Sequence, residues 1–159
     1  MSAAIRYRLA GDADVPALAE LRWRLRTETD GRPADEAQAA FRERCAAFLY
    51  GALASGNWVC WVAETEGRVA ATAFLQRVPK LPRPGRPDEA IGYLTSVYAE
   101  PALRNRGVGE GLLRQVRTWA ERHPVELIVV WPSARSRSLY RRLGFRDESE
   151  IMQLALRPE

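Results

Sequence analysis

Histidine, cysteine and lysine are scarce in this sequence, and their scarcity excludes several kinds of site. The 159 residues include one histidine, His123, and two cysteines, Cys45 and Cys60, which belong to no CxxC pair. A zinc site of clustered cysteine and histidine ligands is therefore excluded, a disulfide framework is not expected, and no metal site is predicted. Lys80 is the only lysine, so arginine carries nearly all of the positive charge.

Long apolar runs and concentrated charge are also lacking. No run approaches the roughly 20 apolar residues that span a bilayer, and the first residues contain no apolar core of a secretory signal. We therefore expect a cytoplasmic protein without a membrane partner. The formal net charge is +4, and the basic residues are dispersed rather than gathered on a face with interleaved aromatics. A nucleic-acid-binding domain is therefore not expected.

The length of the chain predicts a single domain over residues 1–159. Strand signals lie at residues 5–9, 58–64, 68–78, 90–99 and 125–131, and helix signals at 15–26, 34–54, 109–122 and 133–143. Residues 79–88 read as a proline-rich loop, and 145–156 as one or two short strands. The order β-α-α-β-β-β-α-β-α-β(-β) describes an α/β fold, a mixed sheet of about six to seven strands with four helices on both faces. The nearly all-apolar residues 125–131 are expected at the centre of that sheet.

The segment with the strongest chemical signal joins a strand to a helix through Gly107 and Gly109. Glycine has no Cβ, so a ligand can lie close to its backbone, and the unpaired N–H groups of a helix start favour an anion. Arg104 and Arg106 add positive charge. The segment lacks the GK[ST] of a Walker loop and the second βαβ half of a dinucleotide-binding fold. The residues alone leave two alternatives open, a phosphate-binding loop or a tight turn.

Two motifs follow each other in this half of the chain. The first is Arg104-x-x-Gly107-x-Gly109, and the second is Ser133-x-x-Ser136-x-x-Leu139-Tyr140-x-x-Leu143-Gly144-Phe145. With one helix and one apolar strand between them, they resemble the motifs of the GCN5-related N-acetyltransferase (GNAT) family, and the resemblance covers essentially the whole chain. It implies a GNAT fold that takes acetyl-CoA as co-substrate and passes the acetyl group directly to a primary amine in a ternary complex. The alternative is a non-catalytic acyl-CoA-binding module, against which the presence of Tyr140 argues.

The resemblance also implies roles for individual residues. The backbone of Val97, Tyr98 and Ala99 is expected to hydrogen-bond the pantetheine arm of acetyl-CoA. The pyrophosphate is expected on the segment Arg104, Asn105, Arg106, Gly107, Val108, Gly109 and Glu110. Ser133 and Ser136 are expected beside the cofactor, where relatives often have asparagine and alanine. Tyr140 is expected to act as general acid on the leaving thiolate, because a hydroxyl with an ordinary pKa of about 10 holds its proton at neutral pH.

The general base and the acceptor are less well defined by the sequence. Residues 90–97, the strand that carries a glutamate base in some relatives, contain no carboxylate. Glu28, Glu64 and Glu89 are the acidic candidates, with Glu28 expected as a base or as a contact to the acceptor, and backbone carbonyls with water are the alternative. By analogy with the family, residues 23–33 and 79–88 are expected to bind a small-molecule or peptide amine. The sequence leaves the oligomeric state open between a monomer and a homodimer.

Overall fold

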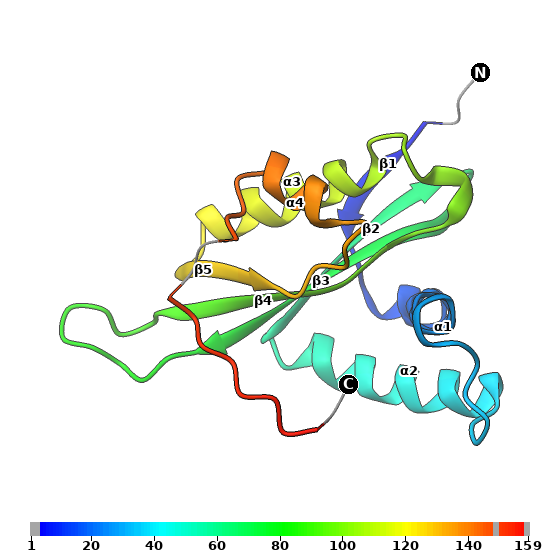
Figure 1. Ribbon diagram of the computed structural model, residues 1–159, viewed down its shortest axis with the longest axis horizontal. Coiled ribbons are helices and arrows are strands. Elements are labelled where there is room, and N and C mark those ends of the chain that lie inside the picture. Colours follow the sequence, from blue (N-terminus) through cyan, green and yellow to red (C-terminus); the bar gives the residue numbers. More distant parts are fainter. Residues whose placement is uncertain (1–3, 148–149, 158–159) are drawn as a thin grey trace.

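One mixed sheet forms the centre of the molecule (Figure 1). The computed structural model describes residues 4–147 and 150–157, and within them the sheet has five strands in the order β1-β2-β3-β4-β5. The strands are β1 Arg6–Leu9, β2 Trp58–Thr65, β3 Arg68–Pro79, β4 Ala90–Ala99 and β5 Val125–Val130. The helices are α1 Val15–Asp30, α2 Gln38–Ala54, α3 Val108–Glu121 and α4 Arg137–Arg142. Neighbouring strands run antiparallel except β4 and β5, which are parallel.

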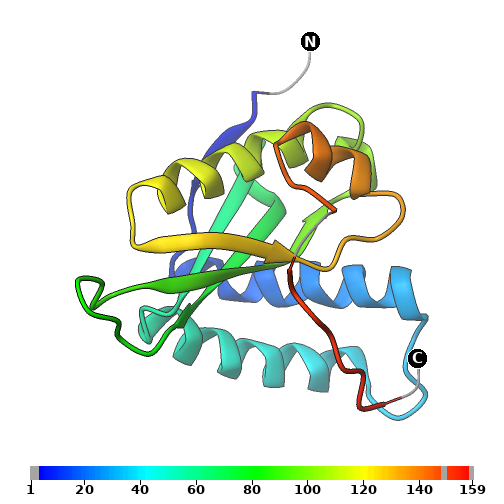
Figure 2. The ribbon, with the colours of Figure 1, turned by 60° about the vertical axis from the view of Figure 1, so that its left-hand side comes forward.

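The helices cover both faces of the sheet, with α1 and α2 on one side and α3 and α4 on the other (Figures 1 and 2). The apolar strand β2 contributes side chains to the hydrophobic core on each face of the sheet. Cys60 and Val62 belong to a buried cluster with α1 and α2, whereas Trp61 and Ala63 belong to the cluster that contains α3. Successive side chains of a strand point to opposite faces, so an unbroken apolar strand packs on both. The predicted fold class, a mixed sheet with four helices on both faces, is confirmed, with five strands in the described residues instead of about six to seven.

Helix α3 is positioned by an apolar face and by a close approach to β1. Leu112, Leu113 and Val116 of α3 are buried against the sheet. At Gly111 an added Cβ would lie 2.2 Å from the hydroxyl oxygen of Tyr7 in β1. Glycine at this position therefore allows α3 to pack close to the aromatic ring, which fixes the start of the helix near the end of β4.

We expect Gly111→Ala to lower the free energy of unfolding by about 1–3 kcal/mol, because the added methyl group overlaps Tyr7 and one of the two must shift. Gly51→Ala in α2 is the matched control, because nothing lies within 4 Å of the Cβ position there. That substitution should stabilise the protein by about 0.5–1 kcal/mol, as alanine does within a helix. Denaturant unfolding measures both values, and equal changes in the two variants would contradict the close packing of α3 on β1.

Two predictions about the sheet are wrong for the described residues. Strand β5 lies at the edge of the sheet instead of its centre, and Leu127 and Trp131 are 40% and 64% exposed. Residues 145–147 and 150–156 form no strand, and residues 148–149 of that predicted region lie outside the described residues. The apolar residues near the C-terminus favour a strand by composition, but a strand also needs a hydrogen-bonded neighbour, which composition does not reveal.

Candidate active site

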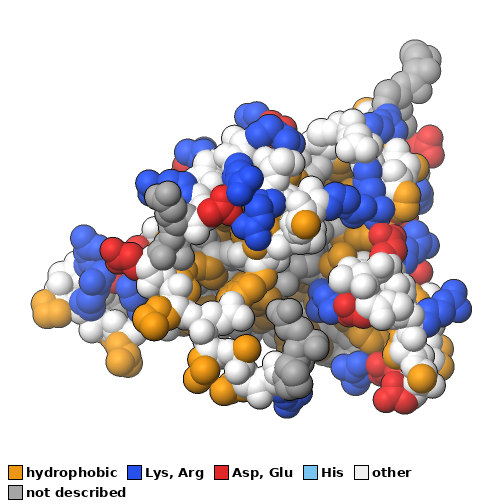
Figure 3. All heavy atoms as spheres, in the orientation of Figure 1, with side chains coloured by type: hydrophobic (Ala, Val, Ile, Leu, Met, Phe, Trp, Pro, Cys, Tyr) orange, Lys and Arg blue, Asp and Glu red, His pale blue; other side chains and the backbone are white. Residues whose placement is uncertain are grey.

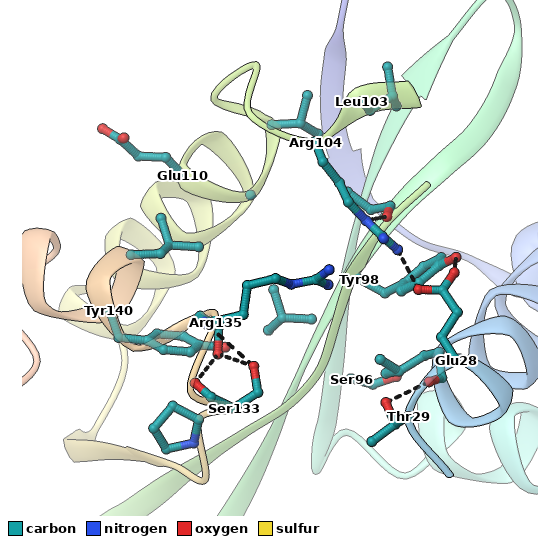
Figure 4. Close-up of a pocket in the computed structure, with 18 of the residues that line it drawn as sticks. Glu28, Thr29, Ser96, Tyr98, Leu103, Arg104, Glu110, Ser133, Arg135 and Tyr140 are labelled. Atoms are coloured by element: carbon teal, nitrogen blue, oxygen red, sulfur yellow. Dashed lines mark hydrogen bonds and ion pairs between the residues drawn. The ribbon is translucent and has the colours of Figure 1, made fainter. Parts of the chain in front are cut away.

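A pocket of about 830 Å³ opens at the C-terminal end of β4. Its walls come from the second half of α1, from residues 95–99 of β4, from the start of α3, and from the segment between β5 and α4 (Figure 4). Figure 3 shows this side of the molecule hollowed below α4, with arginine side chains along the rim. The pocket thus lies beyond the carboxyl ends of the parallel strands, where ligands commonly bind in open α/β sheets.

The last residues of β4 offer an unpaired backbone edge to this pocket. Strand β5 pairs with β4 only as far as Leu94, so within the described part of the chain residues 95–99 have no strand partner on that side. The three residues predicted to hold the pantetheine arm line the pocket here: Val97, Tyr98 and Ala99. An extended ligand with amide groups can hydrogen-bond to such an edge as an added strand would.

A bulge in β4 produces this geometry. Thr72 of β3 pairs with Tyr98 and Phe74 pairs with Thr95, so two residues of β4 oppose one residue of β3. Ser96 within the bulge has a φ of 53°, and its buried hydroxyl has no hydrogen-bond partner among the described residues. Bulges bend a strand, and a non-glycine residue with positive φ is uncommon and strained. Such strain often marks a functional site, and here it lies on the pocket wall.

The start of α3 forms an anion cradle on the opposite wall. Gly107 precedes the helix with a φ of 76°, and no side chain caps the helix. The N–H group of Gly111 donates to the carbonyl of Gly107 at 2.9 Å, so the preceding N–H groups of Val108, Gly109 and Glu110 have no partner within the helix. These groups and the helix dipole favour an anion such as a phosphate. Six of the seven predicted cradle residues line the pocket: Arg104, Asn105, Gly107, Val108, Gly109 and Glu110.

Two charged side chains of this segment have partners outside the cradle. The guanidinium of Arg106 donates to the carbonyl of Ala102 at 3.4 Å, and Arg106 does not line the pocket. The carboxylate of Glu110 accepts a hydrogen bond from Arg114 at 2.6 Å, which holds the pKa of Glu110 below its usual value. The backbone of the segment therefore faces the pocket more directly than these two side chains do.

Glu28, Tyr98 and Arg104 form a hydrogen-bonded cluster, which we call the Glu28 clamp (Figure 4). The Tyr98 hydroxyl donates to Glu28 at 2.5 Å, and Arg104 donates to the other carboxylate oxygen at 2.6 Å. Arg104 also donates through Nε to the carbonyl of Ala99 at 3.0 Å, and its guanidinium lies 5.4 Å from the centroid of the Tyr98 ring. The clamp therefore ties α1 to β4 and to the cradle loop.

The clamp determines the charge of Glu28. Burial opposes ionisation of the carboxyl group, but the hydrogen bonds from Tyr98 and Arg104 outweigh it, and the pKa of Glu28 lies below its usual value. Burial, together with the Glu28 carboxylate, raises the pKa of Tyr98 to about 12. Glu28 is therefore ionised at neutral pH with both oxygens engaged, an arrangement that suits positioning better than proton abstraction.

We expect Glu28→Gln to weaken acetyl-CoA binding by about 2–5-fold, because the Glu28–Arg104 pair is partly exposed and such pairs contribute little. The turnover number should stay nearly unchanged. The plots of kcat/KM against pH for variant and wild type should run parallel above about pH 6, because the Glu28 carboxyl, with its lowered pKa, is already ionised there. Steady-state kinetics over pH checks this expectation. A fall in kcat of about 100-fold or more would instead identify Glu28 as the general base.

Tyr140 projects from α4 into the pocket (Figure 4). It is 6% exposed, and its ring packs edge-on against Phe145 with 5.3 Å between ring centroids. Burial raises the pKa of Tyr140 to about 12, so the hydroxyl is protonated at neutral pH. Within the part of the chain that the structure describes, no group hydrogen-bonds to this hydroxyl. Tyr140 can therefore donate its proton to a group that enters the pocket.

Ser133 and Ser136 shape the turn that precedes α4. Their hydroxyl oxygens lie 2.9 Å apart, and the carbonyl of Ser133 accepts hydrogen bonds from the N–H groups of Ser136 and Arg137 at 3.1 and 3.2 Å. The helix itself begins at Arg137, four residues later than the predicted start at Ser133. Both serines line the pocket, as the sequence predicts.

The other acidic candidates lie elsewhere. Glu64 pairs with Arg8 at 2.7 Å and Glu89 pairs with Arg83 at 2.6 Å, and neither carboxylate lines the pocket. The loop 79–88 lies at the far end of the β3–β4 hairpin (Figure 1), and none of its residues lines the pocket. Residues 89–94 separate this loop from Thr95, the first residue of β4 that lines the pocket, which is about 20 Å along a strand. The structure therefore does not bring the loop to this pocket, whereas residues 25, 26, 28 and 29 of the predicted acceptor segment 23–33 do line it.

Sequence reasoning missed several pocket residues with polar or aromatic side chains, among them Arg22, Trp131 and Arg135. Arg22 follows the buried Leu18 by four residues, so it lies on the same face of α1 as the core, a signal that the periodicity contains. Arg135 reaches into the pocket between Tyr140 and Glu28 (Figure 4). Its position in a turn before α4 left no periodic signal.

Residues 4–147 and 150–157 contain neither a candidate membrane-spanning helix nor a candidate metal site. None of the helices there combines the length and apolarity that a membrane crossing requires. Over the same residues, no group of three or more His, Cys, Asp or Glu side chains could hold a metal ion.

Comparison with known proteins agrees with this geometry. Residues 15–145 match the model of the acetyltransferase (GNAT) family. A glucosamine 6-phosphate N-acetyltransferase of Trypanosoma brucei brucei is 30% identical over 90 residues, 57% of this chain and 59% of that protein. The chain thus matches less than two thirds of the length of this relative.

Solved structures show the same fold over nearly the whole chain. A predicted acetyltransferase from Clostridium acetobutylicum, crystallised with acetyl-CoA, has a TM-score of 0.80 at 25% identity, covering 96% of this chain and 97% of that one. A GCN5-related N-acetyltransferase from Ralstonia eutropha JMP134 has a TM-score of 0.76 at 24% identity, covering 96% and 99%. The resemblance seen in the two sequence motifs is confirmed.

Proposed function

Because the chain belongs to the acetyltransferase (GNAT) family, we propose that it transfers the acetyl group of acetyl-CoA directly to a primary amine in a ternary complex. One observation carries this proposal: a single pocket contains a free strand edge, a helix N-terminus and a protonated tyrosine. Along acetyl-CoA the thioester comes first, the pantetheine amides follow it, and the pyrophosphate comes after the amides. The three parts of the pocket match those three groups.

The donor site uses backbone more than side chains. The pantetheine amides would hydrogen-bond to residues 97–99, where β4 has no neighbour in the described sheet. The pyrophosphate would accept hydrogen bonds from the N–H groups of Val108, Gly109 and Glu110, favoured by the dipole of α3. Arg104, held in place by Glu28 and by the carbonyl of Ala99, adds positive charge beside this site.

The reaction needs one proton removed and one proton supplied. The amine nitrogen attacks the thioester carbonyl carbon, a C–N bond forms, and the C–S bond breaks as the tetrahedral intermediate collapses. The sulfur leaves as a thiolate and takes the proton of the Tyr140 hydroxyl, which is then restored from solvent. The amine proton leaves to water, because the carboxylate of Glu28 is engaged by Tyr98 and Arg104.

The Trypanosoma brucei relative suggests one candidate for the acceptor. The name of the Trypanosoma brucei relative gives an amino sugar phosphate as the acceptor of that protein. An identity of 30% over part of the chain makes this acceptor one candidate among primary amines for the present protein. Residues of α1, including Leu25, Glu28 and Thr29, line the side of the pocket that the acceptor would enter.

A thiol-release assay with acetyl-CoA tests the proposal. The amines should include polyamines, aminoglycosides, amino acids, amino sugars and peptide N-termini, with acetyl-CoA binding measured separately by calorimetry. We expect binding without any amine and thiol release that depends on at least one amine. Binding without thiol release for every amine would instead support a non-catalytic acyl-CoA-binding module.

A further inference from the structure

The α1 side of the pocket contains an arginine without an acidic partner. Arg22 is half-buried and lines the pocket, yet among the described residues no carboxylate lies within ion-pair distance of its guanidinium. The two other arginines nearby on α1 are paired. Arg24 contacts Glu20 and Glu100 at 3.0 and 2.9 Å, and Arg26 pairs with Asp30. Arg22 therefore differs from its neighbours in lacking an acidic partner among the described residues.

This arrangement is unfavourable in the free protein. Burial and the nearby charge of Arg26 lower the pKa of Arg22, which the fields of Cys45, Tyr93 and Asp30 only partly offset. An arginine remains charged despite such shifts, because its ordinary pKa exceeds about 12. A buried cation without a partner destabilises a protein, so an arginine in this position favours an anion that enters the pocket.

The other charges of the pocket leave Arg22 unmatched. The charged residues that line it are Arg22, Arg26, Glu28, Arg104, Glu110, Arg135 and Arg142. Arg104 pairs with Glu28, and Glu110 pairs with Arg114. Arg142 lowers the pKa of Glu110, so Arg142 lies beside the cradle. Arg135 likewise lowers the pKa of Glu28, so Arg135 lies beside the Glu28 clamp. Arg26, which also lies on α1, pairs with Asp30, so Arg22 is the arginine of α1 on the pocket wall that has no acidic partner among the described residues.

The position of Arg22 points to the acceptor rather than the donor. The phosphates of acetyl-CoA belong at the start of α3, on the opposite wall of the pocket from α1 (Figure 4). Arg22 precedes Glu28 by six residues, a separation of about 9 Å along the helix axis. An anion on Arg22 would therefore belong to a second molecule that enters along α1.

An aromatic surface continues from Arg22 towards the site of transfer. Tyr93 lies in the vicinity of Arg22, and its hydroxyl donates to Thr95, which lines the pocket, at 3.3 Å. Trp131 packs edge-on against Tyr93 with 5.3 Å between centroids, remains 64% exposed, and also lines the pocket. These rings offer an apolar wall for the carbon skeleton of a small acceptor.

We propose that the acceptor is a primary amine that also carries an anionic group, a carboxylate or a phosphate, and that Arg22 binds this group. The anion lies on Arg22, the carbon skeleton lies against Tyr93 and Trp131, and the amine reaches the thioester near Tyr140. This inference rests on the proposed acetyl transfer and adds the class of its second substrate. Arg22 is then a specificity-determining residue that takes no part in the bond changes.

Matched pairs of amines test the inference by kcat/KM in the thiol-release assay. L-Leucine against L-leucinamide tests a carboxylate, and O-phosphoethanolamine against ethanolamine tests a phosphate. We expect wild type to prefer the anionic member of one pair by about 10–100-fold, as for a charge-assisted hydrogen bond to a guanidinium. Arg22→Met should reduce this preference to about 1 through a raised KM for the amine, and Arg22→Lys should retain part of it.

Three controls separate this role from a structural one. Arg44→Met in α2 removes an exposed arginine that pairs with Glu36, and it should preserve the preference. Acetyl-CoA affinity should be the same in Arg22→Met as in wild type. Arg22→Met should unfold at the same or a higher temperature than wild type, because it removes an unpaired half-buried cation. A large drop in its melting temperature would show that Arg22 stabilises the fold and would overturn the inference.

The outcomes distinguish the two proposals. Three results would overturn the inference that the acceptor is anionic and leave acetyl transfer in place. They are equal use of charged and neutral amines, acetylation of neutral amines alone, and an unchanged preference in Arg22→Met. Acetyl-CoA binding without acetylation of any anionic amine also counts against the inference. Failure to bind acetyl-CoA at all would overturn the proposed function itself.

Discussion

Replacing Tyr140 by phenylalanine is expected to lower kcat by about 10²–10⁴-fold, the usual contribution of general acid catalysis. The substitution keeps the ring, which packs against Phe145, and removes only the hydroxyl that would protonate the leaving sulfur. Because the donor site consists of β4 and the start of α3, the affinity for acetyl-CoA should be nearly unchanged. Steady-state kinetics with a saturating amine, together with calorimetric binding of acetyl-CoA, measures both quantities.

A matched control and a change of substrate sharpen this test. Tyr50→Phe alters an exposed tyrosine of α2 that does not line the pocket, and it should have wild-type kinetics. A thioester whose thiol is more acidic needs less proton donation, so the difference between Tyr140→Phe and wild type should shrink with such a donor. Full activity of Tyr140→Phe with acetyl-CoA would mean that water protonates the thiolate and that Tyr140 only packs beside the cofactor.

Replacing Gly107 by valine is expected to weaken acetyl-CoA binding by a factor on the order of 100, the loss of about two hydrogen bonds to a charged group at roughly 1.5 kcal/mol each. Gly107 has a φ of 76°, which a β-branched residue adopts only with strain, and relief of that strain would turn the N–H groups of the cradle away from the pyrophosphate. Calorimetric titration of the folded variant with acetyl-CoA measures the change.

Gly85→Val separates the loss of the cradle from general backbone strain. Gly85 has a φ of 77° with nothing within 4 Å of its Cβ position, as at Gly107, but it lies in the loop 79–88, which does not line the pocket. Both variants should lose similar stability, and only Gly107→Val should lose affinity. Equal acetyl-CoA affinity in the two variants would show that the start of α3 does not hold the pyrophosphate.

The order of elements could be read from the sequence because each signal was local. The unbroken apolar run of β2 and the apolar face of α3, with Leu112 and Val116, are patterns within a few residues of chain, and both elements formed as expected. The position of β5 depends instead on which strands pair with it, a property of the whole sheet. Its apolar residues therefore predicted a central strand, whereas Leu127 lies at an exposed edge in the described structure.

In the candidate site, too, the sequence could predict the parts that depend on neighbouring residues of the chain. The cradle was found because Gly107 and Gly109 mark a helix start within a few residues of chain, and the structure places them on the pocket wall. The Glu28 clamp joins residues 70 and 76 positions apart, so no local pattern could show that Glu28 meets Tyr98 and Arg104. The unpaired state of Arg22 was hidden for the same reason, because an absent partner is visible only in three dimensions.

The measurement closest to the central claim is a backbone amide NMR titration with acetyl-CoA. We expect the largest chemical-shift changes at Val108, Gly109 and Glu110, where N–H groups would bind the pyrophosphate, and at residues 97–99, where β4 would bind the pantetheine arm. Smaller changes are expected at Tyr140. Saturable binding with the largest changes outside this pocket, or no saturable change at all, would contradict the assignment of the donor site and the acetyl transfer built on it.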